Sequence, residues 1–306
     1  MANVLVTGGA GFIGSHLASE LIERGSRVRV LDNISTGTRE NLGNLNLDLV
    51  VGDIRDLETV EAALEGIDQV FHLAAEVSVP GSMTEPLTCY ETNVIGTLNV
   101  LESARKADVH SVVMASSAAV YGMSDSSVDE DSPKQPLSPY AASKLAMEAL
   151  GELYTSVYGL PTVALRFFNV YGPRQSPDSP YAAAVPIFIG AMLAGEAPMI
   201  FGDGSQTRDF IYVGDVARAL MLAAEQEKAK GEVMNIGGGA SISILELVEV
   251  VRSLLPEAPE TTFGPARIGD IRYSQAVVAK AKTLLDFSPE ISMRDGLQAT
   301  IRWFRS

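Results

Sequence analysis

Residues that make cross-links and metal sites are scarce in this sequence. Its 306 residues include one cysteine, Cys89, and three histidines, His16, His72 and His110. A single cysteine excludes an internal disulfide, and the scattered histidines show no metal-ligand spacing. We therefore expect no metal, and we expect each histidine to serve in packing or at the surface.

Basic residues and long apolar runs are also scarce. The chain has 23 Lys and Arg residues against 38 Asp and Glu residues, a net charge of -15, and it has no long basic stretch. This balance argues against a nucleic-acid partner. No apolar run approaches the roughly 20 residues that a membrane span needs, and the first residues do not resemble a targeting signal. We expect no membrane partner and a soluble, cytoplasmic protein.

What the sequence does have is a regular alternation of short apolar runs and helical stretches. With 46% hydrophobic residues, the chain can bury a sizeable core. Because such alternation is typical of βαβ units, we predict an α/β fold with a doubly wound parallel Rossmann sheet. The predicted strands are Val4–Val6, Val28–Leu31, Leu49–Val51, Val70–Leu73, Ser111–Ala115 and Thr162–Arg166. The predicted helices span 14–24, 57–65, 91–106 and 139–158.

The sequence changes in character after Tyr171. The stretch GPRQSPDSPY is rich in Pro and Ser, and the segments beyond it are more mixed in length and type. We predict a dinucleotide-binding domain over 1–170 and a smaller, mixed α/β domain over most of 171–306. Val213–Glu225 has the pattern of an amphipathic helix, so we expect 211–235 to pack back on the first domain.

A glycine-rich turn joins the first predicted strand to the first predicted helix. In VLVTGGAGFIGSHL, Gly9-x-Gly11-x-x-Gly14 fits the dinucleotide fingerprint, and Gly8-x-x-Gly11-x-x-Gly14 fits a close variant of it. Glycines let the backbone approach a pyrophosphate, and the start of the helix supplies amide donors and a favourable dipole. The turn therefore predicts a dinucleotide site.

Two acidic residues follow this turn at the ends of later strands. Asp32 lies 18 residues after Gly14, where a carboxylate accepts a hydrogen bond from a ribose 2′-hydroxyl. Because Asp32 would repel a 2′-phosphate, the sequence favours NAD over NADP. Asp53, at the end of the third predicted strand, has two interpretations that stay open: contact with the adenine edge, or capping of the next helix.

A tyrosine and a lysine stand four residues apart in SPYAASK, residues 138–144. Ser138 is a favourable helix cap and Pro139 suits the first helical position, so the pair lies on one face of a helix. A phenol titrates near pH ~10, and a nearby positive charge favours the phenolate. Tyr140 is therefore a candidate general base, with Lys144 as the cation that activates it.

Five motifs, taken in order, resemble a known enzyme family. They are TGGAGFIG, HLAA at 72–75, SSAAVYG at 116–122, Tyr140-x-x-x-Lys144 and RFFNVYGPR at 166–174. Over essentially its full length the chain resembles the extended short-chain dehydrogenase/reductase family, and within it the NAD-dependent nucleotide-sugar epimerases. The stretches YAAAVPIFI, GDGSQTRDFIYVGDV and GDIRYSQAVVAKAK are most similar to the UDP-N-acetylglucosamine/UDP-glucose 4-epimerases.

The resemblance implies a catalytic triad and a redox-neutral reaction. By position the triad is Ser117, Tyr140 and Lys144. Tyr140 would take the proton of the sugar 4-hydroxyl as C4 delivers hydride to the nicotinamide, and Ser117 would relay or hydrogen-bond that hydroxyl. Lys144 would hold the nicotinamide ribose and lower the pKa of Tyr140. The 4-keto sugar would then turn over and take the hydride back, so NAD would be tightly held.

The resemblance also implies two sets of binding residues. The cofactor set is Gly8, Gly11, Phe12, Ile13, Gly14, Asp32, Asn33, Ser35, Thr36, Gly37, Asp53, Ile54, Leu73, Ala74, Ala75, Thr92, Ala115, Tyr140, Lys144 and Phe168. The UDP-sugar set is Ser117, Asn169, Ala184, Val185, Met199, Phe201, Arg208, Arg267, Asp270 and Ser274. In the second set, Asn169 and Arg208 would bind the diphosphate, while Arg267 and Asp270 would hold a phosphate and the uridine ribose.

Single positions separate the related activities. Dehydratases of the family carry an Asp-Glu pair after the catalytic Ser/Thr, and decarboxylases carry a Glu in that stretch, whereas this chain has Ala118 and Ala119. Ser274 stands where a bulky tyrosine restricts some epimerases, so the site should admit an N-acetyl group as well as plain hexoses. A UDP-glucuronate 4-epimerase and a catalytically silent NAD-binding sensor of the same fold stay open as alternatives.

Members of the family commonly form homodimers through two neighbouring helices. The equivalent helices here span 91–106 and 139–158. We therefore expect a homodimer whose two pairs of helices form a four-helix bundle.

Overall fold

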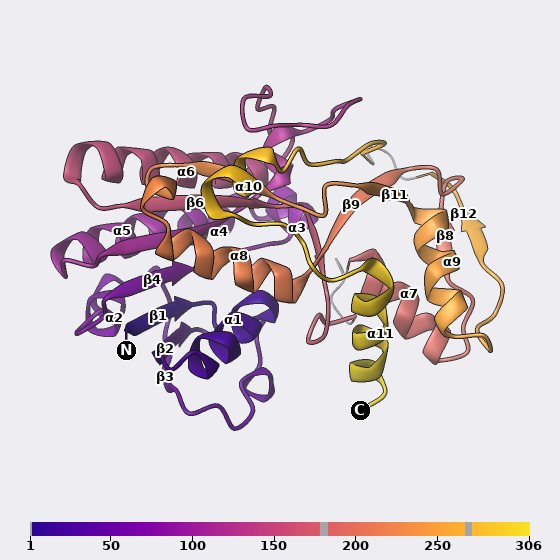
Figure 1. The fold of residues 1–306 in the computed structure, drawn as a ribbon, viewed down its shortest axis with the longest axis horizontal. Helices are drawn as coiled ribbons and strands as arrows, with labels where there is room; N and C mark the ends of the chain where they lie inside the picture. Colours follow the sequence, from indigo (N-terminus) through magenta and orange to yellow (C-terminus); the bar gives the residue numbers. More distant parts are fainter. Residues whose placement is uncertain (1, 178–182, 267–270) are drawn as a thin grey trace.

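A seven-stranded parallel sheet forms the centre of the computed structural model, which describes residues 2–177, 183–266 and 271–306 (Figure 1). The strand order is β10-β6-β5-β4-β1-β2-β3, and all neighbours run parallel. The strands are β1 (Asn3–Thr7), β2 (Arg27–Asp32), β3 (Asp48–Val51), β4 (Gln69–His72), β5 (Ser111–Ser117), β6 (Thr162–Phe167) and β10 (Val233–Ile236). The predicted Rossmann-like sheet is confirmed.

Helices cover both faces of this sheet (Figure 1). On one face an apolar core includes side chains of α1 (Phe12–Glu23), α8 (Val213–Glu225) and α10 (Ala279–Leu285). On the other face a second core includes side chains of α2 (Leu57–Ala63), α5 (Gly96–Lys106) and α6 (Pro139–Tyr158). Because both faces are buried, the strands carry continuous apolar runs rather than an alternating pattern.

The segment before α5 departs from the predicted helix over 91–106. Two short helices, α3 (Val79–Thr84) and α4 (Pro86–Tyr90), lead into a π-helical turn at Glu91–Ile95, and regular α-helix begins only at Gly96. The π-helical turn carries Asn93, whose Nδ2 donates to Ser143 Oγ at 2.9 Å. Such turns recur at functional sites, and this one contacts the helix that carries Tyr140.

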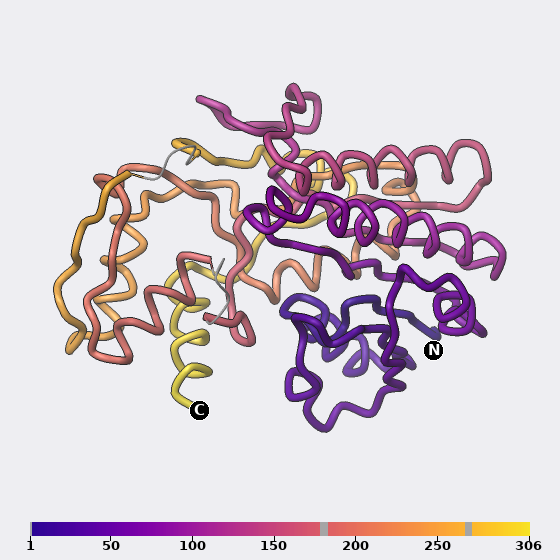
Figure 2. The backbone as a smooth tube through the Cα atoms, turned by 180° about the vertical axis from the view of Figure 1, so that it is seen from behind, coloured from indigo at the N-terminus to yellow at the C-terminus, as the bar shows by residue number. Residues whose placement is uncertain are grey.

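A smaller region lies beyond the carboxyl ends of the central strands (Figures 1 and 2). Its three-stranded sheet has the order β11-β9-β7, and β8 pairs with β12. The elements are β7 (Asn169–Tyr171), β8 (Met199–Phe201), β9 (Thr207–Tyr212), β11 (Ser241–Ser243), β12 (Thr262–Gly264), α7 (Ala184–Leu193), α9 (Ile244–Leu254) and α11 (Met293–Phe304). The helices enclose an apolar core of their own, which includes Phe188, Leu247 and Leu297.

The chain passes between the two parts several times. It leaves the central sheet after β6, returns with α8 and β10, leaves again with β11, and returns with α10. The side chains of Val216 and Leu220 in α8 share a core with Leu17 of α1, and β10 pairs with β6. Residues 213–236 thus complete the central sheet, although they follow elements of the smaller region in the sequence. The division into domains near residue 170 stays a prediction.

Across the described ranges, 2–177, 183–266 and 271–306, no helix is both long enough and apolar enough to cross a bilayer. In the same ranges, no three His, Cys, Asp or Glu side chains come together in a way that would hold a metal ion.

Candidate active site

A large cavity opens at the carboxyl ends of the central strands, where doubly wound sheets bind their ligands. Its volume is about 1540 Å³, and both parts of the chain line it. Every predicted cofactor residue except Gly37 lines this cavity. A side chain at Gly37 would lie 2.5 Å from the carbonyl carbon of Ala10, so this glycine packs against the glycine-rich turn instead. The predicted substrate residues on the cavity are Ser117, Asn169, Ala184, Val185, Met199, Phe201 and Arg208.

The glycine-rich turn has the form that a pyrophosphate requires. Gly8 has a φ of 70°, and a Cβ on Gly14 would lie 2.2 Å from the carbonyl oxygen of Gly8. α1 begins at Phe12 with Gly11 at its N-cap, and no side chain caps it. The first amides of α1 therefore remain for a ligand, at the positive end of the helix dipole. The residues present fit the dinucleotide that the sequence predicts.

Asp32 supports this turn from the end of β2. One carboxylate oxygen accepts from the Ala10 amide at 2.9 Å, and the other accepts from the Ile34 amide at 2.8 Å. The side chain is buried, yet it reaches the cavity wall. Asp32 thus holds the backbone around the cofactor site, and its contact with a ribose hydroxyl stays a prediction.

Asp53 also lines the large cavity. It accepts from Asn33 Nδ2 at 2.9 Å and pairs with Arg55 at 2.8 Å, and these bonds hold the pKa of its carboxyl well below the usual range. The capping alternative for Asp53 is wrong, because Asp56 caps α2 by accepting from the Glu58 amide. Asp53 and Asn33 therefore form one polar edge on the cavity wall.

The fold brings Ser117, Tyr140 and Lys144 together. Ser117 ends β5, while Tyr140 lies in the first turn of α6, which Ser138 caps by accepting from the Ala141 amide. Ser117 hydrogen-bonds the Tyr140 phenol, and Lys144 Nζ lies 5.9 Å from the centre of the Tyr140 ring. Lys144 Nζ donates to the carbonyl oxygen of Ala115 at 2.7 Å, which fixes the cation beside the cavity.

Burial is the largest influence on the pKa values of Tyr140 and Lys144. Burial raises the pKa of Tyr140, and the hydrogen bond from Ser117 offsets this only in part. Burial also lowers the pKa of Lys144 to about 8. Lys144 does not offset the rise in the pKa of Tyr140 in this structure, because both groups are desolvated and the ammonium is directed to Ala115, and its effect on the pKa of Tyr140 beside a bound nicotinamide stays a prediction. Tyr140 is a neutral phenol at pH 7 here.

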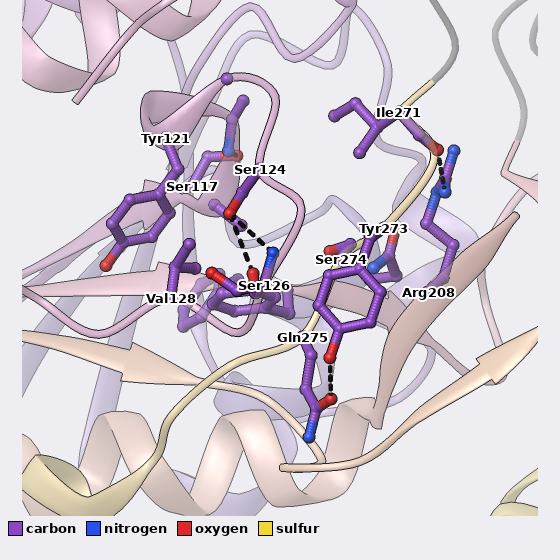
Figure 3. A pocket seen from close by; sticks show the side chains of 16 residues that line it. Ser117, Tyr121, Ser124, Ser126, Val128, Arg208, Ile271, Tyr273, Ser274 and Gln275 are labelled. Atoms are coloured by element: carbon purple, nitrogen blue, oxygen red, sulfur yellow. Dashed lines mark hydrogen bonds between the residues drawn. The ribbon is translucent and has the colours of Figure 1, made fainter. Parts of the chain in front are cut away.

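A smaller pocket of about 220 Å³ adjoins the large cavity (Figure 3). The two share Ser117, Phe167, Phe168, Asn169 and Arg208. Ser274 lines only the smaller one. Figure 3 shows Ser124 and Ser126 on one side and the segment with Ser274 on the other. The predicted Arg267 and Asp270 lie outside the described residues.

Hydrogen bonds to the backbone and between side chains orient the polar groups of this pocket. Arg208 Nη1 donates to the carbonyl oxygen of Ile271 at 2.5 Å, which ties the diphosphate candidate to the segment before Ser274. Asn169 Nδ2 donates to the carbonyl oxygen of Asp209 at 2.8 Å. The Tyr273 hydroxyl donates to Gln275 Oε1 (Figure 3). The pocket wall is thus held by contacts between β9 and residues 271–275.

Sequence reasoning missed buried polar side chains that lie near Lys144. Glu148 forms a buried ion pair with Arg166, and Ser116 Oγ donates to Glu148. His72 is buried with its ring nitrogens 2.8 Å from Thr7 Oγ1 and 2.9 Å from Thr97 Oγ1. The spacing of Glu148, one helical turn after Lys144, is the signal that could have found the first of these groups.

Comparisons with known proteins agree with the site. Residues 4–237 match the model of the NAD dependent epimerase/dehydratase family. The UDP-glucose 4-epimerase of Mycolicibacterium smegmatis is 38% identical over 309 residues, which cover 99% of this chain and 98% of that protein. The UDP-glucuronate 4-epimerase of Thermodesulfobacterium geofontis is 34% identical over 316 residues, which cover 99% and 96%.

A solved structure is similar over the whole fold. The UDP-N-acetylglucosamine 4-epimerase from Methanobrevibacter ruminantium, solved in complex with UDP-N-acetylmuramic acid, has a TM-score of 0.95 and 40% sequence identity, covering 99% of this chain and 98% of that chain. The family match spans most of the chain and includes the glycine-rich turn, the triad and β10. The chain therefore belongs to the NAD dependent epimerase/dehydratase family, and it is an enzyme that uses NAD.

Proposed function

We propose that this chain is a 4-epimerase of UDP-hexoses, which interconverts UDP-GlcNAc with UDP-GalNAc and UDP-glucose with UDP-galactose. The observation that carries the proposal is the position of Ser117, which hydrogen-bonds Tyr140 and lies where the large cavity meets the smaller pocket. On this proposal, residues 1–170 with 211–235 bind NAD, and most of 171–306 binds the UDP-sugar.

The triad residues have distinct roles in the proposed reaction. When bound, NAD supplies a hydride acceptor that later returns the hydride. Tyr140 takes the proton from the sugar 4-hydroxyl and gives it back on the return step, and Ser117 hydrogen-bonds that hydroxyl and the phenol. Lys144 would hold the nicotinamide ribose, and Tyr140 would be ionised more readily with the positive charge of the oxidised cofactor nearby. Asn169 and Arg208 hold the diphosphate while the 4-keto sugar turns over.

The lining of the smaller pocket favours epimerisation over elimination. Ala118 and Ala119 follow Ser117, and none of the described residues that line this pocket is an Asp or a Glu. An elimination needs an acid and a base placed on the sugar ring, and side chains that could supply them do not line this pocket. On this proposal the 4-keto sugar regains the hydride and does not lose water.

The same lining supports the choice of substrate. Ser124, Ser126 and Ser274 present small hydroxyl groups around a space of about 220 Å³. An acetamido group needs room and neutral hydrogen-bond partners, and this pocket offers both. The UDP-glucuronate alternative requires a partner for a carboxylate, and Arg208, the cation on this wall, is assigned to the diphosphate in this proposal.

The test is to incubate the purified protein, without added NAD, with UDP-GlcNAc, UDP-glucose or UDP-glucuronate and to follow the anomeric protons by NMR. Conversion of UDP-GlcNAc to UDP-GalNAc, together with UDP-glucose turnover, is the expected result. Conversion of UDP-glucuronate alone would keep the 4-epimerase and overturn the choice of substrate. No conversion even with NAD supplied would favour the silent sensor.

A further inference from the structure

Arg174 is a cation on the wall of the large cavity whose charge no described residue neutralises. It follows β7 in the loop 172–177 and lines the cavity. Its Nη1 atom is buried, and no atom of the described residues hydrogen-bonds it. The adjacent Gln175 has a buried Oε1 without a partner as well. A guanidinium has five donors and remains charged at pH 7, so burial without a partner is costly unless a ligand completes it.

The other cations on the described cavity wall already have partners. Lys144 donates to Ala115, Arg55 forms two bonds with Asp53, and Arg208 donates to the carbonyl oxygens of Thr207 and Ile271. Arg174 lines the same cavity, but no described residue accepts a hydrogen bond from its buried Nη1 atom.

The position of Arg174 indicates what kind of ligand it meets. The carbonyl oxygen of the preceding residue, Pro173, accepts a hydrogen bond of 2.9 Å from His16 Nε2. His16 lies one turn into α1, and its ring stands edge-on to that of Phe12, the first residue of the helix. Loop 172–177 is thus tied to the helix whose first amides lack a side-chain cap. An anion at this helix start meets amide donors on one side and can meet the guanidinium on the other.

The backbone at Arg174 also has an unusual conformation. Its φ is 65°, in the left-handed region that residues other than glycine rarely adopt. Such conformations persist where the surroundings require them, and they gather at ligand sites.

We propose that Arg174 binds a pyrophosphate through charge-assisted hydrogen bonds, with Gln175 accepting from a neighbouring hydroxyl of the same ligand. Two pyrophosphates can reach this wall, that of NAD and that of the UDP-sugar. The hydrogen bond that joins loop 172–177 to α1 favours the pyrophosphate of NAD as the ligand of Arg174. Binding of the UDP-sugar pyrophosphate by Arg174 rests on the proposed function. Binding of the NAD pyrophosphate by Arg174 rests only on the family to which the chain belongs.

The test uses Arg174→Met, Arg174→Lys and a matched control, Arg24→Met. Arg24 stands at the far end of α1, where it pairs with the exposed Glu225 at 3.6 Å. The full-length chain is freed of cofactor and titrated calorimetrically with NAD, UDP and adenosine, which lacks a phosphate. For Arg174→Met we expect NAD affinity to fall about tenfold to hundredfold, with adenosine affinity unchanged. Arg174→Lys should recover part of this loss, and Arg24→Met should bind like the parent chain.

Thermal melting separates binding from a structural role. Because no described residue pairs with the guanidinium, Arg174→Met should melt at the same temperature as the parent without ligand, or higher, and gain less from added NAD. A loss of UDP affinity instead of NAD affinity would assign the pyrophosphate to the substrate. Unchanged affinity for both, or a lower melting temperature without ligand, would overturn the proposal. If the parent chain fails to bind UDP, the proposed function fails while the NAD measurement still stands.

Discussion

Arg166 and Glu148 form a two-pronged ion pair near Lys144 of the candidate triad. Nε and Nη2 of Arg166 lie 2.9 and 2.8 Å from the two carboxylate oxygens of Glu148, and both side chains are buried. Ser116 also donates to Glu148, and Arg166 Nη1 donates to the hydroxyl of Tyr121 at 2.8 Å. The pair therefore joins α6 to β5 and β6 next to the residues that we expect to do the chemistry.

Glu148→Gln should lower the free energy of unfolding by about 3 to 5 kcal/mol, because it leaves the Arg166 charge buried without its counter-charge. Urea unfolding would measure this. Glu102→Gln is the matched control, since Glu102 pairs with Arg105 on the surface and should cost at most about 1 kcal/mol. The double variant Glu148→Met/Arg166→Met should lose less than the sum of its single variants. Equal losses for Glu148→Gln and Glu102→Gln would contradict this account.

Tyr140→Phe should lower kcat by about 10²- to 10⁴-fold, because it removes the group that exchanges the proton of the 4-hydroxyl. The ring and its packing remain, so the NAD content of the purified protein should not change. Turnover by NMR and NAD released by acid would measure the two properties, with Tyr90→Phe as a control on an exposed tyrosine. Unchanged turnover would point to the silent sensor.

Ser274→Tyr should reduce turnover of UDP-GlcNAc by about tenfold or more while UDP-glucose turnover persists, because a phenol ring would fill much of the 220 Å³ pocket. Ser274→Ala keeps the space and should convert both substrates. Initial rates with the two UDP-sugars provide the comparison. If Ser274→Tyr slowed both equally, the pocket would hold a part of the substrate that the two sugars share.

His72 should make the protein less stable in mild acid. Burial lowers the pKa of His72 from 6.5 to about 3, so the unfolded chain binds this proton more readily. The stability that neutral His72 contributes is full above pH 6.5 and is lost as the pH falls toward 3. Between pH 6.5 and 4.5 this amounts to about 2 to 3 kcal/mol.

Urea unfolding at pH 7.5 and at pH 4.5 tests this. The difference in unfolding free energy should shrink in His72→Gln and stay the same in His110→Gln, because His110 is exposed. An unchanged difference in His72→Gln would show that other groups carry the acid sensitivity.

The outer face of α6 should form the expected homodimer contact. Leu153 and Val157 are 46% and 62% exposed and stand one turn apart on this helix. Leu153→Lys/Val157→Asp should convert the dimer to a monomer, as light scattering after size-exclusion chromatography would show. Leu245→Lys, on an exposed residue of α9, is the control. A parent chain that already elutes as a monomer would refute the expectation.

The parts of the fold that sequence predicts well are those set by local patterns. The bounds predicted for 139–158 match α6, because Ser138, Pro139 and the glycine after Tyr158 mark both ends. β10 was missed, since its place beside β6 depends on a contact between distant segments. Spacing also could not predict how burial raises the pKa of Tyr140 and lowers that of Lys144, because it shows which groups are near each other and not how far burial removes them from water.

The late position of β10 in the sequence has a consequence for how the protein is made. β6 is the edge strand of the central sheet until Val233–Ile236 has left the ribosome. Val216 and Leu220, which cover one face of the sheet, are synthesised only shortly before this segment. During synthesis the nascent chain therefore exposes an unpaired parallel edge, a known starting point for aggregation. Chaperones that bind unfinished chains would protect it best between the emergence of β6 and that of β10.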